Sequence, residues 1–461
     1  MTMSKRQRVA LVQYPASQSF VLDSLLPALA KELPDWRVLT TRDAATLEVD
    51  LQWSDYDEVD WDAGLGEGRM VNSYLIRKGL IRKNHLAHTL ALYLSKNPTS
   101  PLRSATPKTF IFNLSFPDEL DELLCDDLYE LQESFQSEND HWWILKAALA
   151  DKGNGIRLFK DREGLEAIFE EFQPESDDEE DDEDEGDLGE LARGIQGAYG
   201  LATRVDSSQM QEWVIQEYIS SPLLLSSPLS SNFPPRKFHL RVYAVAVGQL
   251  SLYVHHPFLA LFAPSPYLHP SSTTSGDPID LSSHLTNTCL QAENGMEEEG
   301  IVVELFQEME EWIISSAVGK DEKFGADRVK AVEGKVEEIL GETFKAGVGA
   351  GSAFQTLPNC FEIFGCDLLV DDALNVTLLE INACPDFSQT GLALQSVINN
   401  LFEETLKVAV VPFFGKIDDG GDAELDGQFD QLGITEGKNG TGNLRKVMEM
   451  QVRGGGMGAS R

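Results

Sequence analysis

The pattern of hydrophobic and polar positions begins with an α/β unit. Residues 8–14 (RVALVQY) carry the apolar run of a strand, residues 19–33 have the spacing of an amphipathic helix, and residues 36–40 (WRVLT) predict a second strand. Residues 72–94 (NSYLIRKGLIRKNHLAHTLALYL) then predict helices that carry basic side chains. This order of elements predicts an N-terminal α/β domain, to which we assign residues 1–108.

Two further units follow, and each is predicted from its strands. Residues 141–149 (HWWILKAAL) and 156–159 (IRLF) predict two strands joined by the loop ADKGNG, in a central subdomain placed at residues 109–232. Strict alternation over residues 236–247 (RKFHLRVYAVAV) belongs to a C-terminal subdomain placed at residues 233–415. A chain of 461 residues is too long for one ordinary core, so several α/β subdomains are expected.

Two segments differ in composition from these units. Residues 175–187 contain eleven Asp and Glu residues, which predicts a disordered insertion in the central subdomain. Residues 416–461 are rich in glycine and polar residues and predict a flexible tail. The formal charge of the chain is −39, and it is −28 without those eleven acidic residues. This charge argues against nucleic acid or an anionic membrane as the main partner.

Cysteine usage and the N-terminal sequence predict a cytoplasmic or nucleocytoplasmic protein. The five cysteines are dispersed and include no C-x-x-C pair, which favours a reducing compartment over disulfides or structural zinc. The first apolar run extends only from Val9 to Val12, which is too short for a signal peptide. No stretch of the sequence approaches the length needed to span a bilayer.

Three oxygen-bearing side chains interrupt the apolar strands of residues 361–387 (FEIFGCDLLVDDALNVTLLEINACPDF). If these strands pair about the acidic turn at their centre, Asp367 lies opposite Glu380. Asn382 then shares their face, because side chains alternate with period two. Two carboxylates and an amide suit Mg²⁺ and do not suit zinc. The alternative interpretation is a solvated sheet face with no bound metal.

A strand that ends in a lysine and a glycine-containing loop complements these carboxylates. Lys146 offers a positive charge to phosphate oxygens, and Gly153 and Gly155 let backbone N–H groups approach them. The chain has no G-x-x-x-x-G-K-[ST] sequence, so this loop is not a P-loop. Taken alone, an ordinary hairpin with one exposed lysine explains this segment equally well.

Two more strands bear side chains suited to a nucleotide site. Lys237, His239 and Arg241 alternate with apolar residues and share one strand face, where cations can bind a triphosphate and an anionic intermediate. A solvated strand face is again the alternative. The strand in residues 212–225 (EWVIQEYISSPLLL) ends at Gln216–Ile219, whose backbone groups can contact a purine edge. The segment SHLTNTCLQ adds a polar cluster made of His284, Thr286 and Asn287.

Five segments in this order together resemble the tubulin-tyrosine ligase family. They are residues 143–156, 213–225, 236–247, 283–291 and 361–387, and the resemblance covers residues 70 to 400. That family has an ATP-grasp fold, so the resemblance implies ATP held between two α+β subdomains. It implies a ligase that activates a carboxylate as an acyl phosphate, which an amine then attacks to form an amide or peptide bond. The implied partners are a free amino acid and a protein acceptor, either tubulin or another protein.

The resemblance also implies cofactors and residue roles. The cofactors are ATP and Mg²⁺, and Arg241 is the catalytic residue that stabilises negative charge on the intermediate. The metal ligands are Asp367, Glu380 and Asn382. The nucleotide contacts are Lys146, Gly153, Gly155, Gln216, Glu217, Tyr218, Ile219, Lys237, Asp367 and Asn382. The substrate contacts are Arg82, Lys83, His239, His284, Thr286 and Asn287.

Two positions depart from the family pattern. His239 stands where the family has an aspartate in K-F-D-[IL]-R, and Leu261 stands near the place of a family arginine that helps to bind substrate. These departures support a rival hypothesis, a nucleotide-binding pseudoenzyme that serves as an interaction module in cytoplasmic ribonucleoprotein granules. Together with the negative charge of the chain, they also predict an acceptor other than an acidic tubulin tail.

Overall fold

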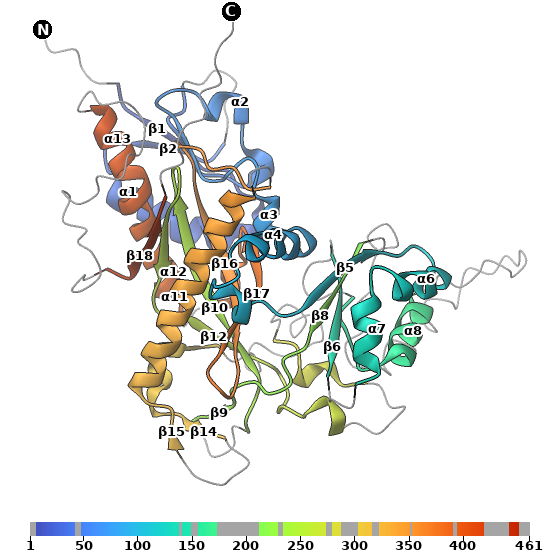
Figure 1. Ribbon diagram of the computed structural model, residues 1–461. Coiled ribbons are helices and arrows are strands. Elements are labelled where there is room, and N and C mark those ends of the chain that lie inside the picture. The colour runs from blue at the N-terminus through green and yellow to red at the C-terminus, as the bar shows by residue number, and fades with distance from the viewer. Residues whose placement is uncertain are drawn as a thin grey trace, which may run out of the picture.

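The computed structural model shows sheets surrounded by helices, with one sheet set apart from the rest (Figure 1). It describes residues 6–41, 48–137, 141–148, 155–172, 212–228, 234–272, 279–286, 303–315, 322–350, 353–390, 394–418 and 442–450. Within these ranges, no helix is both long enough and apolar enough to cross a membrane.

The N-terminal domain is built on a small parallel sheet. Its strands have the order β2-β1-β3-β4, and each neighbouring pair is parallel. The elements are β1 (Val9–Leu11), α1 (Ser19–Glu32), β2 (Arg37–Leu39), β3 (Leu51–Gln52) and β4 (Met70–Val71). The βαβ opening predicted from the hydrophobic pattern is confirmed. Because the strands are parallel, their carboxyl ends lie at one edge of the sheet.

The central subdomain is an antiparallel sheet with the order β5-β8-β6-β7. Three helices lie together on one side of it (Figure 1). The elements are β5 (Thr109–Asn113), α6 (Leu120–Cys125), α7 (Tyr129–Phe135), β6 (Trp143–Ala147), β7 (Arg157–Phe159), α8 (Arg162–Glu171) and β8 (Glu212–Glu217). Trp213 of β8 and Phe169 of α8 meet edge to face at 5.2 Å, because the apolar face of each element is buried against the other.

The C-terminal subdomain is a seven-stranded sheet centred on β10, which pairs with β16 along one edge and with β11 and β12 along the other. Its strands are β10 (Phe238–Val247), β11 (Ser251–His255), β12 (Leu259–Phe262), β13 (Val303–Leu305), β16 (Phe361–Val370), β17 (Val376–Ala383) and β18 (Leu444–Glu449). Val242 shares a core with Val336 of the long helix α11 (Ala326–Gly349). Tyr243 shares a second core with Leu401 of α12 (Gln395–Thr405), so successive residues of β10 face opposite layers.

Short helices and a small sheet connect these units. The helices are α2 (Trp61–Gly64), α3 (Lys78–Ile81), α4 (Lys83–Lys96), α5 (Leu102–Ala105) and α13 (Val411–Asp418), and a π-helical segment (Leu406–Val410) joins α12 to α13. The small sheet has the order β15-β14-β9, with β9 (Leu225–Ser226), β14 (Ile313–Ile314) and β15 (Glu322–Lys323). Thus β9 precedes the predicted boundary at residue 232 but pairs with a strand that follows it.

The C-terminal residues contradict part of the prediction for residues 416–461. Residues 416–418 complete α13, and β18 (Leu444–Glu449) adds to β11 as an antiparallel strand. The Glu404 carboxylate accepts hydrogen bonds from the first backbone N–H groups of this segment. A flexible tail is therefore wrong for these two stretches. The predicted acidic insertion at 175–187 lies outside the described residues.

Candidate active site

The hairpin of β16 and β17 brings the three predicted oxygen donors together. Asp367 pairs with Glu380, which confirms the predicted register, and a bulge follows between Asp367 and Leu368. Asn382 Nδ2 lies 3.2 Å from Asp367 Oδ2 and 3.3 Å from Glu380 Oε1. We call Asp367, Glu380 and Asn382 the carboxylate cluster.

Arg241 lies opposite Asp367 on the neighbouring strand and forms a buried ion pair with it. Its Nε donates to Oδ1 at 2.5 Å and its Nη2 donates to Oδ2 at 3.2 Å. Burial alone would raise the pKa of Asp367, but the charge of Arg241 holds the pKa of that carboxyl well below its usual value. Asp367 is therefore ionised throughout the physiological pH range.

His239 lies between this ion pair and the polar cluster of the SHLTNTCLQ segment. Its Nδ1 is 2.5 Å from Thr286 Oγ1, and its Nε2 is 3.5 Å from Asp367 Oδ1. Nε2 is buried and has no hydrogen-bond partner among the described residues. Strand β12 places Leu261 directly opposite His239, and Leu261 is only 1% exposed. The strand beside His239 thus presents an apolar side chain to this part of the site.

Lys146 of β6 and Lys237, just before β10, form a second group that we call the lysine pair. Burial lowers the pKa of Lys146 to about 8, and burial together with the charge of Lys146 lowers the pKa of Lys237 to about 7. Their hydrogen-bond partners are neutral: Lys146 donates to Gln216 Oε1 at 2.8 Å, and Lys237 donates to Tyr218 Oη at 3.0 Å. Within the described part of the chain, neither lysine forms an ion pair with a carboxylate.

Tyr218 connects the lysine pair to His284. Its hydroxyl lies 2.9 Å from His284 Nδ1 while accepting a hydrogen bond from Lys237. Burial, reinforced by the charge of Lys237, lowers the pKa of His284 to about 3, so the ring is neutral and Nδ1 can accept the tyrosine proton. His284, which was predicted to contact the substrate, therefore contacts Tyr218, a residue that was predicted to contact the nucleotide.

The segment Gln216–Ile219 was predicted to contact adenine, but some of its backbone N–H groups already form hydrogen bonds with backbone carbonyls. The Glu217 N–H donates to Lys108 O at 2.8 Å, and the Tyr218 N–H donates to Trp142 O at 2.9 Å. Among the described residues no acceptor is present for the Ile219 N–H. Of these three amide groups, the one of Ile219 is the donor that a ligand could use.

The basic residues of the segment 72–94 lie in different environments, some beside the candidate site and some in the protein interior. Lys83 Nζ lies 3.9 Å from Glu380 Oε2, so Lys83 adjoins the carboxylate cluster, while Arg82 is exposed. Arg77 is buried, with its Nη1 2.7 Å from Glu362 Oε1. Glu362 is a buried partner of the basic segment that the sequence analysis did not single out, although an acidic side chain in the apolar run FEIFG was a visible signal.

The glycine loop and the end of the polar cluster are only partly described. Gly155 is buried and has a φ of +70°, a left-handed conformation that glycine adopts without steric strain. Gly153 and Asn287 lie outside the described residues. Their predicted roles stay predictions.

The donor set of the carboxylate cluster fits Mg²⁺ and phosphate. Asn382 places an N–H donor between two carboxylates, at a position that a cation could take if the amide turned its oxygen inward. No group of three or more His, Cys, Asp and Glu side chains in the described ranges is arranged to hold a metal ion. Two carboxylates and one amide are few protein ligands, as is typical of Mg²⁺ whose coordination is completed by phosphate oxygens and water. The lysine pair would bind the phosphate oxygens of the same ligand.

Comparison with curated proteins shows two fungal relatives of high similarity. The chain is 36% identical to the probable tubulin–tyrosine ligase PBY1 of Saccharomyces cerevisiae over 93% of its own length, but this covers 55% of that relative. It is 37% identical to a probable tubulin–tyrosine ligase of Schizosaccharomyces pombe over 80% of its length, which covers 84% of that relative. The chain therefore spans about half the length of the first relative and most of the second.

A solved structure shows the same fold. It is the C-terminal domain of Pby1 from K. lactis, described as an ATP-grasp enzyme that interacts with the mRNA decapping enzyme Dcp2. The TM-score is 0.63 at 27% identity, and the match covers 96% of this chain and 100% of that one. The fold is thus an ATP-grasp fold, as the family resemblance implied. The model of the tubulin-tyrosine ligase family matches residues 70–418, and this chain belongs to that family.

Proposed function

We propose that this protein is an ATP-dependent carboxylate–amine ligase that joins a free amino acid to a carboxylate of an acceptor protein. The supporting observation is the convergence of the carboxylate cluster, Arg241 and the lysine pair, whose residues come from four strands, β6, β10, β16 and β17, and from the position just before β10. Ligands for a hard cation, and desolvated ammonium groups for phosphate, are the two requirements of a site for MgATP. Family membership is consistent with this chemistry.

Each group has a distinct proposed role. The carboxylate cluster would hold Mg²⁺, the lysine pair would bind phosphate oxygens, and the Ile219 N–H would face the adenine ring. Bound MgATP would supply the phosphoryl group that activates the acceptor carboxylate for attack by the amine. Arg241 is fixed by Asp367, so its guanidinium offers the N–H groups not used in that pair to negative charge that develops on the reacting carboxylate.

The variant Glu380→Gln tests the metal assignment. It removes one negative ligand while keeping the shape of the side chain, so the affinity for MgATP should fall and the affinity for ATP without Mg²⁺ should change little. Asp372→Asn is the matched control, because Asp372 lies in the turn of the same hairpin and is exposed. Isothermal calorimetry measures both affinities, and equal MgATP binding by wild type and Glu380→Gln would rule out this metal site.

Ligase activity itself is tested with the purified protein, MgATP, a mixture of amino acids and cell extract. Mass spectrometry should detect acceptor peptides that have gained one amino-acid residue, together with release of ADP. Arg241→Lys should reduce these adducts while retaining a positive charge, because a lysine cannot form the bidentate pair with Asp367.

A second candidate function is an interaction module that binds nucleotide without ligating. His239 and Leu261 favour it, because the family carries an aspartate and an arginine near these positions. The solved neighbour interacts with a decapping enzyme, which supports a cytoplasmic location in ribonucleoprotein granules for this chain also. Binding of a decapping enzyme by a protein that forms no adducts in the experiment above would support this candidate against the ligase.

The proposed acceptor is a protein other than an acidic tubulin tail. The charge of −39 opposes approach of an acidic tail, and Arg77 is buried against Glu362, so its charge is not exposed to attract one. Incubation with detyrosinated tubulin, tyrosine and MgATP should therefore give little product. Efficient addition of tyrosine under these conditions would contradict this choice of acceptor and leave the ligase proposal intact.

A further inference from the structure

Tyr243 continues a series of candidate site residues on one face of β10. Lys237, His239 and Arg241 lie at alternate positions of the sequence, and Tyr243 is the next position in this series. Because side chains alternate between the two faces of a strand, Tyr243 shares the face that carries Arg241. Lys237 begins the series, so Tyr243 lies beyond Arg241, on the side away from the proposed phosphate contacts.

Two neighbouring rows of residues cross β10, β16 and β17 on this face. In the first row, Arg241 pairs with Asp367, and Asp367 pairs with the glutamate of the carboxylate cluster. In the second row, Tyr243 pairs with Gly365, and Gly365 pairs with Asn382. The register therefore places Tyr243 one row away from the buried ion pair, in the same row as the amide of the carboxylate cluster.

Gly365 leaves the middle of the second row without a side chain. A Cβ atom at this position would lie 3.4 Å from Arg241 Cδ and 2.8 Å from Pro385 Cβ. The side chain of Arg241 and the segment that follows β17 therefore approach each other over the glycine. A larger residue would push them apart, so the glycine permits this close approach at the row that contains Tyr243.

The hydroxyl of Tyr243 is a buried donor without a partner. Tyr243 is 1% exposed, and its Oη has no hydrogen-bond partner among the described residues. Burial raises the pKa of this hydroxyl more than the charge of Arg241 lowers it, so the group stays protonated at physiological pH. It can therefore donate a hydrogen bond but cannot act as a base. A buried hydroxyl without a partner is uncommon in proteins, and an acceptor on a ligand would satisfy it.

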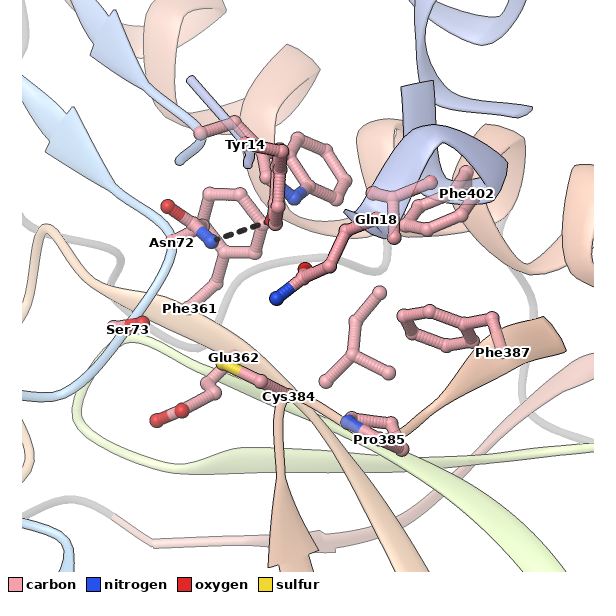
Figure 2. Close-up of a pocket in the computed structure, with 13 residues that line it drawn as sticks. Tyr14, Gln18, Asn72, Ser73, Phe361, Glu362, Cys384, Pro385, Phe387 and Phe402 are labelled. Carbon is pink, nitrogen blue, oxygen red and sulfur yellow. Dashed lines mark hydrogen bonds between the residues drawn. The ribbon is translucent and has the colours of Figure 1, made fainter. Parts of the chain in front are cut away.

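A hollow opens to solvent beside this row (Figure 2). It encloses about 420 Å³, including its open mouth, and Pro385 and Phe387 are among the residues that line it. The rings of Tyr243 and Phe387 pack with their centroids 5.5 Å apart. Phe387 thus belongs both to the wall of the hollow and to the packing of Tyr243, so an opening lies one residue away from the tyrosine ring.

We propose that Tyr243 is a further catalytic residue, whose hydroxyl donates a hydrogen bond to the reacting carboxyl group beside Arg241. This inference rests on the ligase function proposed above. The guanidinium of Arg241 offers positive charge to that group, and the phenol would add a neutral donor that is held in place by Phe387. Preorganised donors stabilise the negative charge that develops on an oxygen during acyl and phosphoryl transfer.

The same donor would act in both steps of the reaction. In the first step, a carboxylate oxygen bonds to the γ-phosphorus of ATP, the bond from that phosphorus to the bridging oxygen breaks, and ADP leaves. In the second step, the amine nitrogen bonds to the acyl carbon, and the carbonyl oxygen carries negative charge until phosphate leaves and the amine gives up a proton to solvent. Tyr243 would hold the carboxylate in the first step and donate to the charged oxygen in the second.

The variant Tyr243→Phe separates this role from a structural one, because it removes only the hydroxyl oxygen. The melting temperature should stay constant or rise, since a polar group without a partner leaves the interior. Tyr74→Phe is the matched control, because Tyr74 is also buried and its Oη donates to Gly248 O at 2.9 Å. Loss of that hydrogen bond should lower the melting temperature and leave turnover unchanged.

Turnover is measured as formation of ATP from ADP and acetyl phosphate by the purified full chain with Mg²⁺. An ADP oxygen bonds to the phosphorus of acetyl phosphate and acetate leaves, so negative charge develops on a departing carboxylate, and no acceptor protein has to be known. Luciferase detects the ATP, and a reaction without acetyl phosphate gives the background. Tyr243→Phe should lower kcat by at least about tenfold and leave the KM for MgADP unchanged.

Two results would overturn the proposal. The first is a kcat of Tyr243→Phe equal to that of the wild type. The second is lost turnover accompanied by a fall in melting temperature as large as that of Tyr74→Phe, which would make the hydroxyl a structural group. If the wild type binds MgADP in a calorimetric titration but forms no ATP, the ligase function itself fails, and the role of Tyr243 fails with it.

Discussion

The carboxylate cluster and the lysine pair belong to one site but are held in opposite ways. In the cluster, Asp367 is paired with Arg241 at 2.5 Å and Asn382 donates to both carboxylates. The lysine pair has only neutral hydrogen-bond partners among the described residues, and burial lowers the pKa of both ammonium groups. The charge of Asp367 in the carboxylate cluster is therefore balanced without a ligand, whereas the ammonium groups of the lysine pair have no hydrogen-bonded carboxylate among the described residues.

This difference indicates that the lysine pair is the part of the site that would bind an anion. For Lys146, desolvation outweighs the attraction of Glu380 and Asp367, as its lowered pKa shows, so a buried ammonium group at this position costs stability in the free protein. An incoming phosphate would supply the missing charge. The buried ion pair, by contrast, fixes the position of Arg241 before any ligand binds, which is the property expected of a group that acts on a reacting atom.

Breaking the ion pair should give the largest effect. Arg241→Ala leaves the Asp367 carboxylate buried and unpaired, so the free energy of unfolding should fall by about 3–5 kcal/mol in a urea titration. Lys31→Ala is the control, because Lys31 forms an exposed pair with Glu403 and its removal should leave stability nearly unchanged. If the two variants unfold at the same urea concentration, the ion pair does not hold the site together.

Removing one member of the lysine pair should mainly affect ligand binding. Lys146→Ala should weaken MgATP by about tenfold to a hundredfold, because a hydrogen bond between charged groups is lost, while adenosine binds as before. Stability should not fall, since a desolvated charge is removed. Lys108→Ala serves as the control with an exposed lysine. Equal losses for MgATP and adenosine would mean that Lys146 does not face the phosphates.

The lowered pKa values of the lysine pair predict proton uptake on binding of ATP. Above pH 7 to 8 the free protein holds partly neutral lysines, with pKa values near 7 for Lys237 and 8 for Lys146. Phosphate charge favours the protonated forms, so binding at pH 8 should take up protons, and binding at pH 6 should take up few because both lysines are already charged. Calorimetry in buffers of different ionisation enthalpy measures this, and proton release at pH 8 would contradict it.

The smallest effect is expected for deletion of residues 175–187. The sequence predicts an insertion outside the catalytic core, so both the melting temperature and the MgATP affinity should be nearly unchanged. Differential scanning calorimetry and titration of wild type and deletion variant provide the comparison. A fall of several degrees in the melting temperature would show that this acidic tract packs against the folded protein. The tract would then contribute to stability in addition to the carboxylate cluster and the lysine pair.

The part of the site that was predictable from sequence depends on local patterns. The facing of Asp367 and Glu380 follows from two strands joined by a short turn, because alternation fixes which side chains share a face. The bulge after Asp367 has no such signal, since it depends on how the strands accommodate the rest of the sheet. The shared face of Lys237, His239 and Arg241 was likewise readable from alternation alone.

The remainder required tertiary structure. Arg77 meets Glu362 from a distant part of the chain, so neither local spacing nor composition could show that its charge is buried. The hollow drawn in Figure 2 combines residues that follow three N-terminal strands, such as Tyr14, Trp53 and Ser73, with residues of β16, and no motif in the sequence spans them. The fold class was accessible because the family resemblance rests on five ordered segments, whereas the partners of single charges depend on contacts between those segments.

The strand β18 has a consequence for how the protein avoids aggregation. It covers the outer edge of β11, all five of whose residues are buried, through antiparallel pairing from Ser251 to His255. Without residues 442–450, β11 would present a row of unpaired N–H and C=O groups to any extended chain nearby. A protein shortened after Asp418 should then associate edge to edge, and light scattering would rise with its concentration. Strand β18 thus protects the edge of the central sheet from pairing with other chains.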